Sequence, residues 1–235
     1  MKAFFFDSIY NTQEFALEEL NSEPILVISF HQEKGKGTSN RSWLNADQSL
    51  ACSLAFNKDD SKLDETLIPL LSGLCFTEVL SESPIFLKWP NDLILNKFKC
   101  GGILIENISS KADNHHILAI GIGVNLIKSP LRTTFPSSSI YDETNVKIDP
   151  YKFLLELNKN IVKKIDYWNY GLNYKAILEK WIEKAYLLNK EISVTLPNGK
   201  KEKGIFSSID NEGGLILSTK KSDKVFYAAE IFEGL

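Results

Sequence analysis

Two short stretches decide how this chain folds: KWPND at residues 88–92 and KCGG at residues 99–102. The apolar runs beside them, 85–88 and 103–106, are typical of buried strands. Pro90 fixes its own φ and biases the preceding residue toward an extended backbone, so the turn between the strands is stiff. Stiff turns held by a rigid sheet often carry active sites. The lysines, carboxylate, amide and glycines gathered here suit a substrate that bears phosphate and carboxylate groups.

The composition is that of an ordinary globular protein. The chain has 235 residues, of which 43% are hydrophobic and 24% charged, enough for a full core and a small second domain. A net charge of −3 argues against nucleic acid as a partner, and no run approaches the ~20 apolar residues of a membrane span. Three scattered cysteines favour neither a disulfide framework nor a zinc site, so we expect a reducing cytoplasm.

Apolar patterning predicts a mixed α and β arrangement up to about residue 188. The expected strands are 4–6, 25–30, 49–56, 85–88, 103–106 and 117–127. The expected helices are 12–20, with Thr12 as N-cap, 63–80, 150–167 and 174–186. Residues 32–46 are expected to form a long loop and 129–145 a surface excursion. Short alternating runs from residue 191 onward predict a small all-β barrel of roughly 45 residues. We place the boundary near Asn189, which divides the chain into 1–188 and 189–235.

Two further constellations accompany the central turn. The loop QEKGKGTSNRSW at 32–43 has glycines whose N–H groups can form an anion-binding concavity. The same residues are also compatible with a flexible basic loop that binds nothing. The 32–43 loop lacks the P-loop pattern. The strand GIGVN at 121–125 has glycine at two positions and so lacks two side chains. Such glycines are expected where a ligand or another backbone segment approaches the strand closely, or at a β-bulge. In the central turn, Asp92 is a candidate metal ligand or general base and Asn91 a polar phosphate or metal contact, unless the turn is merely structural.

Taken in order, the 32–43 loop, KWPND, KCGGILIE at 99–106 and GIGVN closely resemble the biotin–protein ligases, the biotin–[acetyl-CoA carboxylase] ligases. The resemblance covers essentially the whole chain. It implies an α+β fold, with a catalytic domain like that of class II aminoacyl-tRNA synthetases and lipoate ligases and a C-terminal SH3-like β-barrel. Some members carry an N-terminal helix-turn-helix that binds DNA. Here the first catalytic strand opens the sequence, so the short form is expected.

The resemblance implies a reaction in two half-steps. The biotin carboxylate attacks the α-phosphorus of ATP, giving biotinyl-5′-AMP and pyrophosphate. A lysine of a biotin carboxyl carrier domain then attacks the mixed anhydride, giving an amide and AMP. Catalysis of this kind is mostly positioning and electrostatic stabilisation. Biotin, ATP with Mg²⁺ and the carrier domain are the implied partners, and a homodimer through the edge of the catalytic sheet is known among relatives.

Family positions assign roles to individual residues. Lys99 meets the biotin carboxylate and the adenylate linkage, while Asp92 places magnesium with Asn125 and accepts the proton of the incoming amine. The implied biotin and biotinyl-AMP contacts are Asn11, Thr12, Gln13, Gln32, Gly35, Lys36, Gly37, Thr38, Lys99, Gly102, Gly121 and Gly123. The implied ATP and phosphate contacts are Lys36, Arg41, Lys88, Asn91 and Asn125.

The sequence departs from the family pattern at two places. The usual Ser-Thr-Asn falls on Asn11, Thr12 and Gln13, and the usual Gly-Arg-Gly-Arg has Lys36 and Thr38 in place of its arginines. Lys36 keeps the charge but not the bidentate fork, and Thr38 carries no charge. Cys100 beside Lys99 reads as a small apolar residue, with a nucleophile as the alternative.

Two other functions stay open. A lipoate–protein ligase would run the same chemistry on another acid, but its Arg-rich Gly-Gly-Gly segment is missing. A non-catalytic binder of biotin or a nucleotide would fit the substitutions at 11, 13 and 38. The joint presence of Lys99, Asp92 and Asn125 argues against that binder.

Overall fold

The computed structural model describes residues 1–38, 41–44, 46, 48–58, 65–110, 115–131, 133, 135–169 and 174–233. Its larger part is built on a seven-stranded sheet with the order β1-β2-β5-β9-β8-β7-β6. The outer strand β1 runs parallel to β2, and every other neighbouring pair is antiparallel. The strands are β1 Lys2–Ile9, β2 Ile25–Gln32, β5 Leu50–Lys58, β6 Ile85–Lys88, β7 Asp92–Leu95, β8 Phe98–Ser110 and β9 His115–Val124.

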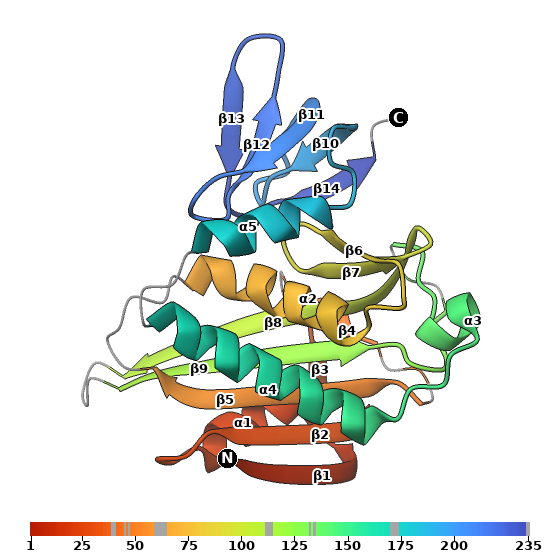
Figure 1. Cartoon of the computed structure of the whole chain (residues 1–235), viewed down its shortest axis with the longest axis vertical. Coiled ribbons are helices and arrows are strands. Elements are labelled where there is room, and N and C mark those ends of the chain that lie inside the picture. The colour runs from red at the N-terminus through yellow and green to blue at the C-terminus, as the bar shows by residue number, and fades with distance from the viewer. Residues whose placement is uncertain are drawn as a thin grey trace.

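Helices cover the two faces of this sheet unequally. Helix α1, Thr12–Glu19, lies on one face, and α2, Ile68–Val79, and α4, Pro150–Asn169, lie on the other (Figure 1). Strand β2 shows why both faces are filled. Ile25 and Val27 pack with α1, and the alternate residues Leu26 and Ile28 join the core beneath α2 and α4. Burial on both faces explains the unbroken apolar runs in the sequence.

The face under α1 is paved with small residues. Along the middle of β5 and β9, the side chains that would project toward α1 are reduced to methyl, hydroxymethyl or hydrogen. In register these pairs are Ala51 with Gly123, Ser53 with Gly121, and Ala55 with Ala119, and Gly102 of β8 lies beside Gly123. The sheet therefore leaves a shallow floor on this face, while the opposite face is filled with larger apolar side chains.

The C-terminal part is a five-stranded antiparallel sheet with the order β13-β12-β11-β10-β14. Its strands are β10 Glu191–Thr195, β11 Lys201–Ile209, β12 Leu215–Ser218, β13 Asp223–Phe226 and β14 Glu230–Glu233. Within the described residues β13 and β14 are outer strands, so the sheet is open, where strand spacing predicted a closed barrel. The α+β class is confirmed, and the boundary near Asn189 stays a prediction.

The C-terminal sheet packs directly on the larger part of the molecule. Phe206 and Leu217 belong to the same buried cluster as Trp89 of the central turn. The Trp89 indole N–H donates to the Gly213 carbonyl at 2.8 Å. Helix α5, Tyr174–Glu183, lies between the two sheets (Figure 1). The KWPND turn is thus anchored against the C-terminal unit.

Several sequence expectations need correction. The predicted loop 32–46 contains a hairpin of two short strands, β3 Gly35–Lys36 and β4 Ser42–Trp43, which sequence periodicity cannot reveal because each is two residues long. Asn11, not Thr12, caps α1. The helix expected at 63–80 starts as the 3₁₀ turn η2, Glu65–Leu67, before α2; its first two positions lie outside the described residues. Helix α3, Ile140–Thr144, falls inside the expected surface excursion, because Ile140 is fully buried.

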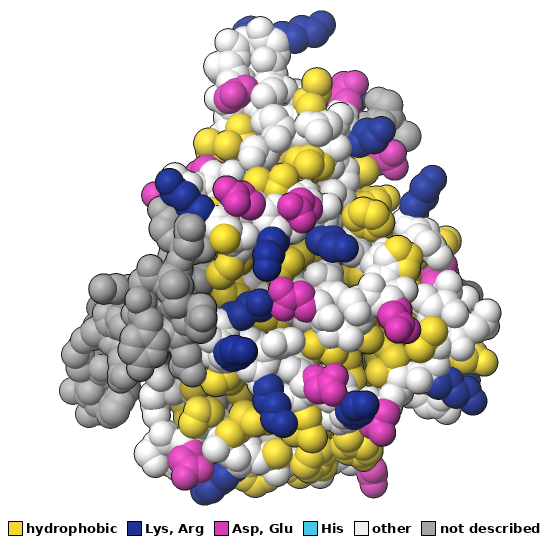
Figure 2. All heavy atoms as spheres, viewed as in Figure 1, with side chains coloured by type: hydrophobic (Ala, Val, Ile, Leu, Met, Phe, Trp, Pro, Cys, Tyr) yellow, Lys and Arg dark blue, Asp and Glu magenta, His cyan; other side chains and the backbone are white. Residues whose placement is uncertain are grey.

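Helix α4 is amphipathic. Phe153, Leu157 and Ile161 are buried against the sheet and α2. Figure 2 shows lysine and arginine side chains interspersed with acidic ones over this face, with small apolar areas between them. Among the described residues, no helix is long and apolar enough to cross a bilayer.

Candidate functional site

A pocket opens on the α1 face, between the small-residue floor, the start of α1 and the β3–β4 hairpin. It holds about 450 Å³ of space free of protein atoms, part of which is open to solvent. Most of the residues predicted for biotin or phosphate line it. They are Thr12, Gln13, Gln32, Lys36, Gly37, Thr38, Asn91, Lys99, Gly102, Gly121 and Gly123. Six predicted residues are not in this lining: Asn11, Gly35, Arg41, Lys88, Asp92 and Asn125.

A wider depression lies on the outer side of the same hairpin. It shares Gln32, Lys36, Gly37, Thr38, Trp43 and Leu104 with the pocket, so the two hollows are neighbours. The depression adds two residues predicted from the sequence, Gly35 and Arg41. The hairpin therefore contributes residues to two neighbouring hollows.

The start of α1 is fixed by a buried polar network. The Gln32 Oε1 accepts from the Thr12 backbone N–H at 2.7 Å and from the Thr12 hydroxyl at 2.8 Å, and that hydroxyl lies 2.8 Å from the Ser53 hydroxyl. Asn11 Oδ1 caps the helix by accepting from the N–H groups of Gln13 and Glu14. These bonds hold one end of the pocket rigid.

Asn11 also ties α1 to the hairpin, because its Nδ2 donates to the Lys34 carbonyl at 2.7 Å. Both polar atoms of this side chain are thus engaged in structural bonds. The contact between Asn11 and biotin stays a prediction.

The paired glycines make room for side chains of the chain itself. A Cβ at Gly121 would overlap the Gln13 amide, which donates to the Leu104 carbonyl at 3.3 Å. A Cβ at Gly123 would lie 2.6 Å from Trp43 Cζ2, well inside contact distance. Trp43 therefore lies over the glycine floor as a roof of the pocket.

Trp43 also carries an unused donor. Its indole N–H is buried and has no hydrogen-bond partner in the described structure. A buried donor without a partner is costly, so a ligand that accepts a hydrogen bond here would be favoured.

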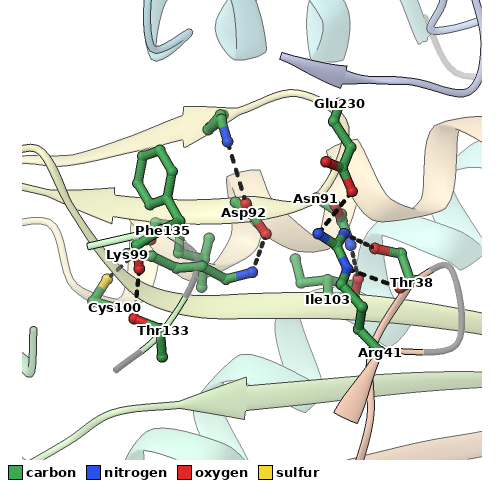
Figure 3. Close-up of polar contacts among 12 residues, drawn as sticks. Thr38, Arg41, Asn91, Asp92, Lys99, Cys100, Ile103, Thr133, Phe135 and Glu230 are labelled. Carbon is green, nitrogen blue, oxygen red and sulfur yellow. Dashed lines mark hydrogen bonds and ion pairs between the residues drawn. The ribbon is translucent and has the colours of Figure 1, made fainter. Parts of the chain in front are cut away.

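The charged end of the site is centred on Asp92. Its Oδ1 lies 2.5 Å from Lys99 Nζ, and its Oδ2 lies 3.7 Å from Lys88 Nζ. Figure 3 shows the Asp92 carboxylate directed toward Lys99. Lys99 lines the pocket and its side chain is 27% exposed, so its ammonium can reach a ligand while Asp92 holds it in place. Lys99 and Lys36 thus place two lysines at the wall of the pocket, and of these Lys99 is the one held by Asp92.

Lys88 has a different environment. Its side chain is 8% exposed, with Nζ 4.2 Å from the Phe135 ring centroid and 5.6 Å from that of Phe232. Burial lowers its pKa, and the nearby Asp92 carboxylate opposes that change. Because it does not line the pocket, its predicted contact with phosphate stays a prediction.

The predicted magnesium ligands have suitable donor atoms but are differently engaged. Asn125 is buried, its Nδ2 donates to the Ser138 carbonyl at 3.2 Å, and its Oδ1 has no partner in the described structure. That free oxygen is a fitting hard donor. The Asp92 oxygens, by contrast, face two ammonium groups. No cluster of three acidic, histidine or cysteine side chains occurs among the described residues, so substrate phosphate would have to complete such a site.

Both cations of the hairpin are already paired with carboxylates. Lys36 Nζ lies 2.7 Å from Glu14 Oε1 of α1, and this hydrogen bond raises the pKa of Lys36. Arg41 Nη1 lies 2.7 Å from Glu230 Oε1 of β14. Arg41 also donates to the Thr38 carbonyl and hydroxyl, at 3.3 and 3.1 Å.

Cys100 is excluded as a nucleophile by its environment. Its thiol is fully buried, within 3.5 Å of the Leu93 carbonyl, and burial raises its pKa to about 12. A protonated thiol without access to the pocket is a weak nucleophile. The interpretation of Cys100 as a small apolar residue agrees with this.

Three residues that shape the site had no role predicted from the sequence. Trp43, Ala51 and Ser53 line or support the pocket. The signal for the last two was present: residues 51, 53 and 55 are small, while the alternate positions 50, 54 and 56 are larger and apolar. Such alternation indicates that one face of a strand must stay shallow.

Comparison with known proteins gives a family for both parts. Residues 5–125 match the model of the Biotin/lipoate A/B protein ligase family, and residues 187–234 match that of the Biotin protein ligase C terminal domain. The first match spans just over half of the chain and contains all the predicted site residues.

Individual relatives agree with this match. A biotin–[acetyl-CoA-carboxylase] ligase of Paracoccus denitrificans is 29% identical over 88% of this chain and 90% of that protein. The bifunctional ligase/repressor BirA of Bacillus subtilis is 27% identical over 96% of this chain and 72% of its own length.

Solved structures share the fold. The biotin protein ligase of Aquifex aeolicus, in complex with biotin and ATP, has a TM-score of 0.85 at 24% identity and covers 99% of each chain. The biotin acetyl coenzyme A carboxylase synthetase of Helicobacter pylori, with bound biotinylated ATP, has a TM-score of 0.67 at 25% identity and covers 95% of this chain and 99% of that one.

Proposed function

Because the chain belongs to the biotin/lipoate A/B protein ligase family, we propose that it activates biotin with ATP and transfers it to a lysine of a biotin carboxyl carrier domain. The observation that carries this proposal is Lys99, whose ammonium lies at the pocket wall and is held by Asp92 at 2.5 Å. A fixed cation in a small cavity suits the meeting of a carboxylate with a phosphate. The named ligase relatives favour biotin as the acid.

In the first half-step a carboxylate oxygen of biotin bonds to the α-phosphorus of ATP, and the bond to pyrophosphate breaks. Both reactants are anions, so bringing them together costs electrostatic energy that Lys99 offsets. Backbone N–H groups of the glycine-rich hairpin and the free donors of Arg41 are placed to bind phosphate oxygens. The rigid α1 end and the Trp43 roof would hold the biotin ring system and exclude water.

In the second half-step an uncharged lysine amine of the carrier attacks the acyl carbon, AMP leaves, and the amine loses a proton. We assign that proton to Asp92. Its Oδ2 is the freer oxygen, since Lys88 lies 3.7 Å away while Lys99 holds Oδ1 at 2.5 Å. Magnesium, arriving with ATP, would meet Asp92 and Asn125 oxygens and would neutralise charge on the triphosphate.

The remaining proposals concern partners and setting. Three unpaired cysteines support a reducing compartment such as the cytoplasm. The carrier domain of a biotin-dependent carboxylase is the proposed acceptor. The homodimer expected from relatives stays a prediction, and sedimentation of the purified chain would test it.

The transfer step can be tested with a carrier domain of acetyl-CoA carboxylase. Incubation with the purified chain, ATP, magnesium and biotin should add one biotinyl group, visible by intact mass spectrometry. A carrier whose acceptor lysine is replaced by arginine is the matched control. Labelling of the arginine carrier, or of neither carrier, would contradict the proposed acceptor.

A further inference from the structure

We infer that Glu230 of the C-terminal sheet is a positioning residue for ATP, because it holds the Arg41 guanidinium in place over the glycine-rich hairpin. This inference rests on the proposed function. Arg41 Nη1 lies 2.7 Å from Glu230 Oε1, across the junction of the two sheets. Figure 3 shows Glu230 reaching toward Arg41 from one side and Thr38 meeting it from the other.

The guanidinium is held by two elements at once. Its Nε donates to the Thr38 carbonyl at 3.3 Å and its Nη2 to the Thr38 hydroxyl at 3.1 Å. Together with the Glu230 contact, these bonds use one donor on each nitrogen. An arginine has five such donors, so two are left for an incoming anion. The arrangement fixes the cation and still leaves it able to bind phosphate.

The same contacts shape the hairpin. The Gly37 N–H donates to the Arg41 carbonyl at 2.7 Å, so Arg41 closes the loop with its backbone as well as its side chain. Gly37 and Thr38 line both hollows. A displacement of Arg41 would therefore move the N–H groups that are placed to meet the ligand.

Strand β14 presents a whole face to the catalytic part. Glu230 and Phe232 alternate with the buried Ile231, so they project to the same side of the strand. Glu230 reaches Arg41, and the Phe232 ring lies 5.6 Å from Lys88 Nζ. One strand of the C-terminal sheet thus contacts two cations assigned to ATP.

Thr38 of the hairpin explains why the Glu230 carboxylate is useful for orienting Arg41. The residue at 38 carries no charge, so Arg41 is the guanidinium that this hairpin offers to the hollow, beside the ammonium groups of Lys34 and Lys36. Thr38 can accept a hydrogen bond from Arg41, which a second arginine could not do. Thr38 and Glu230 together orient a single guanidinium.

The test is a steady-state pyrophosphate assay with ATP varied at saturating biotin. Glu230→Ala should raise the KM for ATP about threefold to fivefold, the range that a partly exposed ion pair supports, and leave the KM for biotin unchanged. Glu230→Asp should recover part of this loss. Glu233→Ala, on the same strand but exposed, is the control and should match the wild type.

A double-mutant cycle separates positioning from general support. If Glu230 acts through Arg41, then Glu230→Ala should have no further effect in an Arg41→Ala background. The exchanged pair Arg41→Glu with Glu230→Arg should keep the wild-type unfolding temperature and yet retain a raised KM for ATP.

Additive effects in the cycle, a wild-type KM in Glu230→Ala, or full recovery in the exchanged pair would each overturn the inference. A wild-type chain that releases no pyrophosphate with biotin would refute the proposed function itself, whereas a normal wild type with an unchanged Glu230→Ala refutes only the role of Glu230.

Discussion

Replacing Lys99 tests the chemical centre of the site. Lys99→Met removes the ammonium that lies 2.5 Å from Asp92 and lines the pocket, and keeps much of the side-chain volume. A hydrogen bond to a charged group contributes about 1.5–3 kcal/mol, which corresponds to about a 10-fold to 150-fold slower formation of the adenylate. Partial exposure of Lys99 argues against a larger effect, because water screens its charge.

The fold should survive this change. After Lys99 is removed, Asp92 still faces Lys88 at 3.7 Å, so no buried carboxylate is left without a cation. We expect the free energy of unfolding to fall by less than about 1 kcal/mol. A loss of activity can then be separated from a loss of folded protein.

The assay is single-turnover pyrophosphate release with ATP and biotin, alongside urea unfolding of the same preparations. Lys159→Met, on the exposed face of α4, is the matched control and should behave as the wild type. A Lys99→Met enzyme with the wild-type rate of pyrophosphate release would refute the assignment of Lys99 to the reacting carboxylate.

Three further predictions follow from the geometry. Gly123→Ala forces Trp43 off the glycine floor at a cost of about 1–3 kcal/mol, so calorimetry should show weaker binding of biotin. An unchanged affinity for biotin would contradict the assignment of Trp43 to the pocket wall. Asn11→Ala removes the cap of α1 and the bond to Lys34, and urea unfolding should report a loss of about 0.5–2 kcal/mol; an unchanged midpoint would oppose this. Cys100→Ala should keep its rate of pyrophosphate release, and a large loss would restore the thiol as a candidate. The Cys100 pKa is raised from 9.0 to about 12 in the folded state, because burial favours the neutral thiol. The contribution of this thiol to the free energy of unfolding is therefore complete below pH 9 and is lost as the pH rises toward 12. Alkaline unfolding of Cys100→Ala should therefore be less steep than that of the wild type.

The sequence predicted the large sheet well, because its strands are buried on both faces and read as continuous apolar runs. Strands β2, β5 and β9 lie within a few residues of their expected bounds. The β3–β4 hairpin, β7 and β14 escaped prediction. The hairpin strands span two residues each, and β14 has a single fully buried position, Ile231. Neither leaves a periodic signal.

The site was predictable in its motifs and not in its contacts. Lys99, Gly121 and Gly123 line the pocket as their motifs indicated. The carboxylates that hold the two hairpin cations, Glu14 and Glu230, belong to elements far away in the chain, so only the packing of α1 and β14 brings them near. The glycine floor was expected to face a ligand or a backbone, whereas it also accommodates the chain's own Gln13 and Trp43.

The most direct test of the account is the acid that the purified chain adenylates. The chain should be incubated with ATP and magnesium, and with biotin, lipoate or no acid, and both pyrophosphate and the acyl adenylate should be measured. We predict pyrophosphate release and an equal amount of biotinyl-5′-AMP with biotin alone. Adenylation of lipoate in preference to biotin, or binding of biotin without pyrophosphate release, would contradict the proposal that this pocket activates biotin.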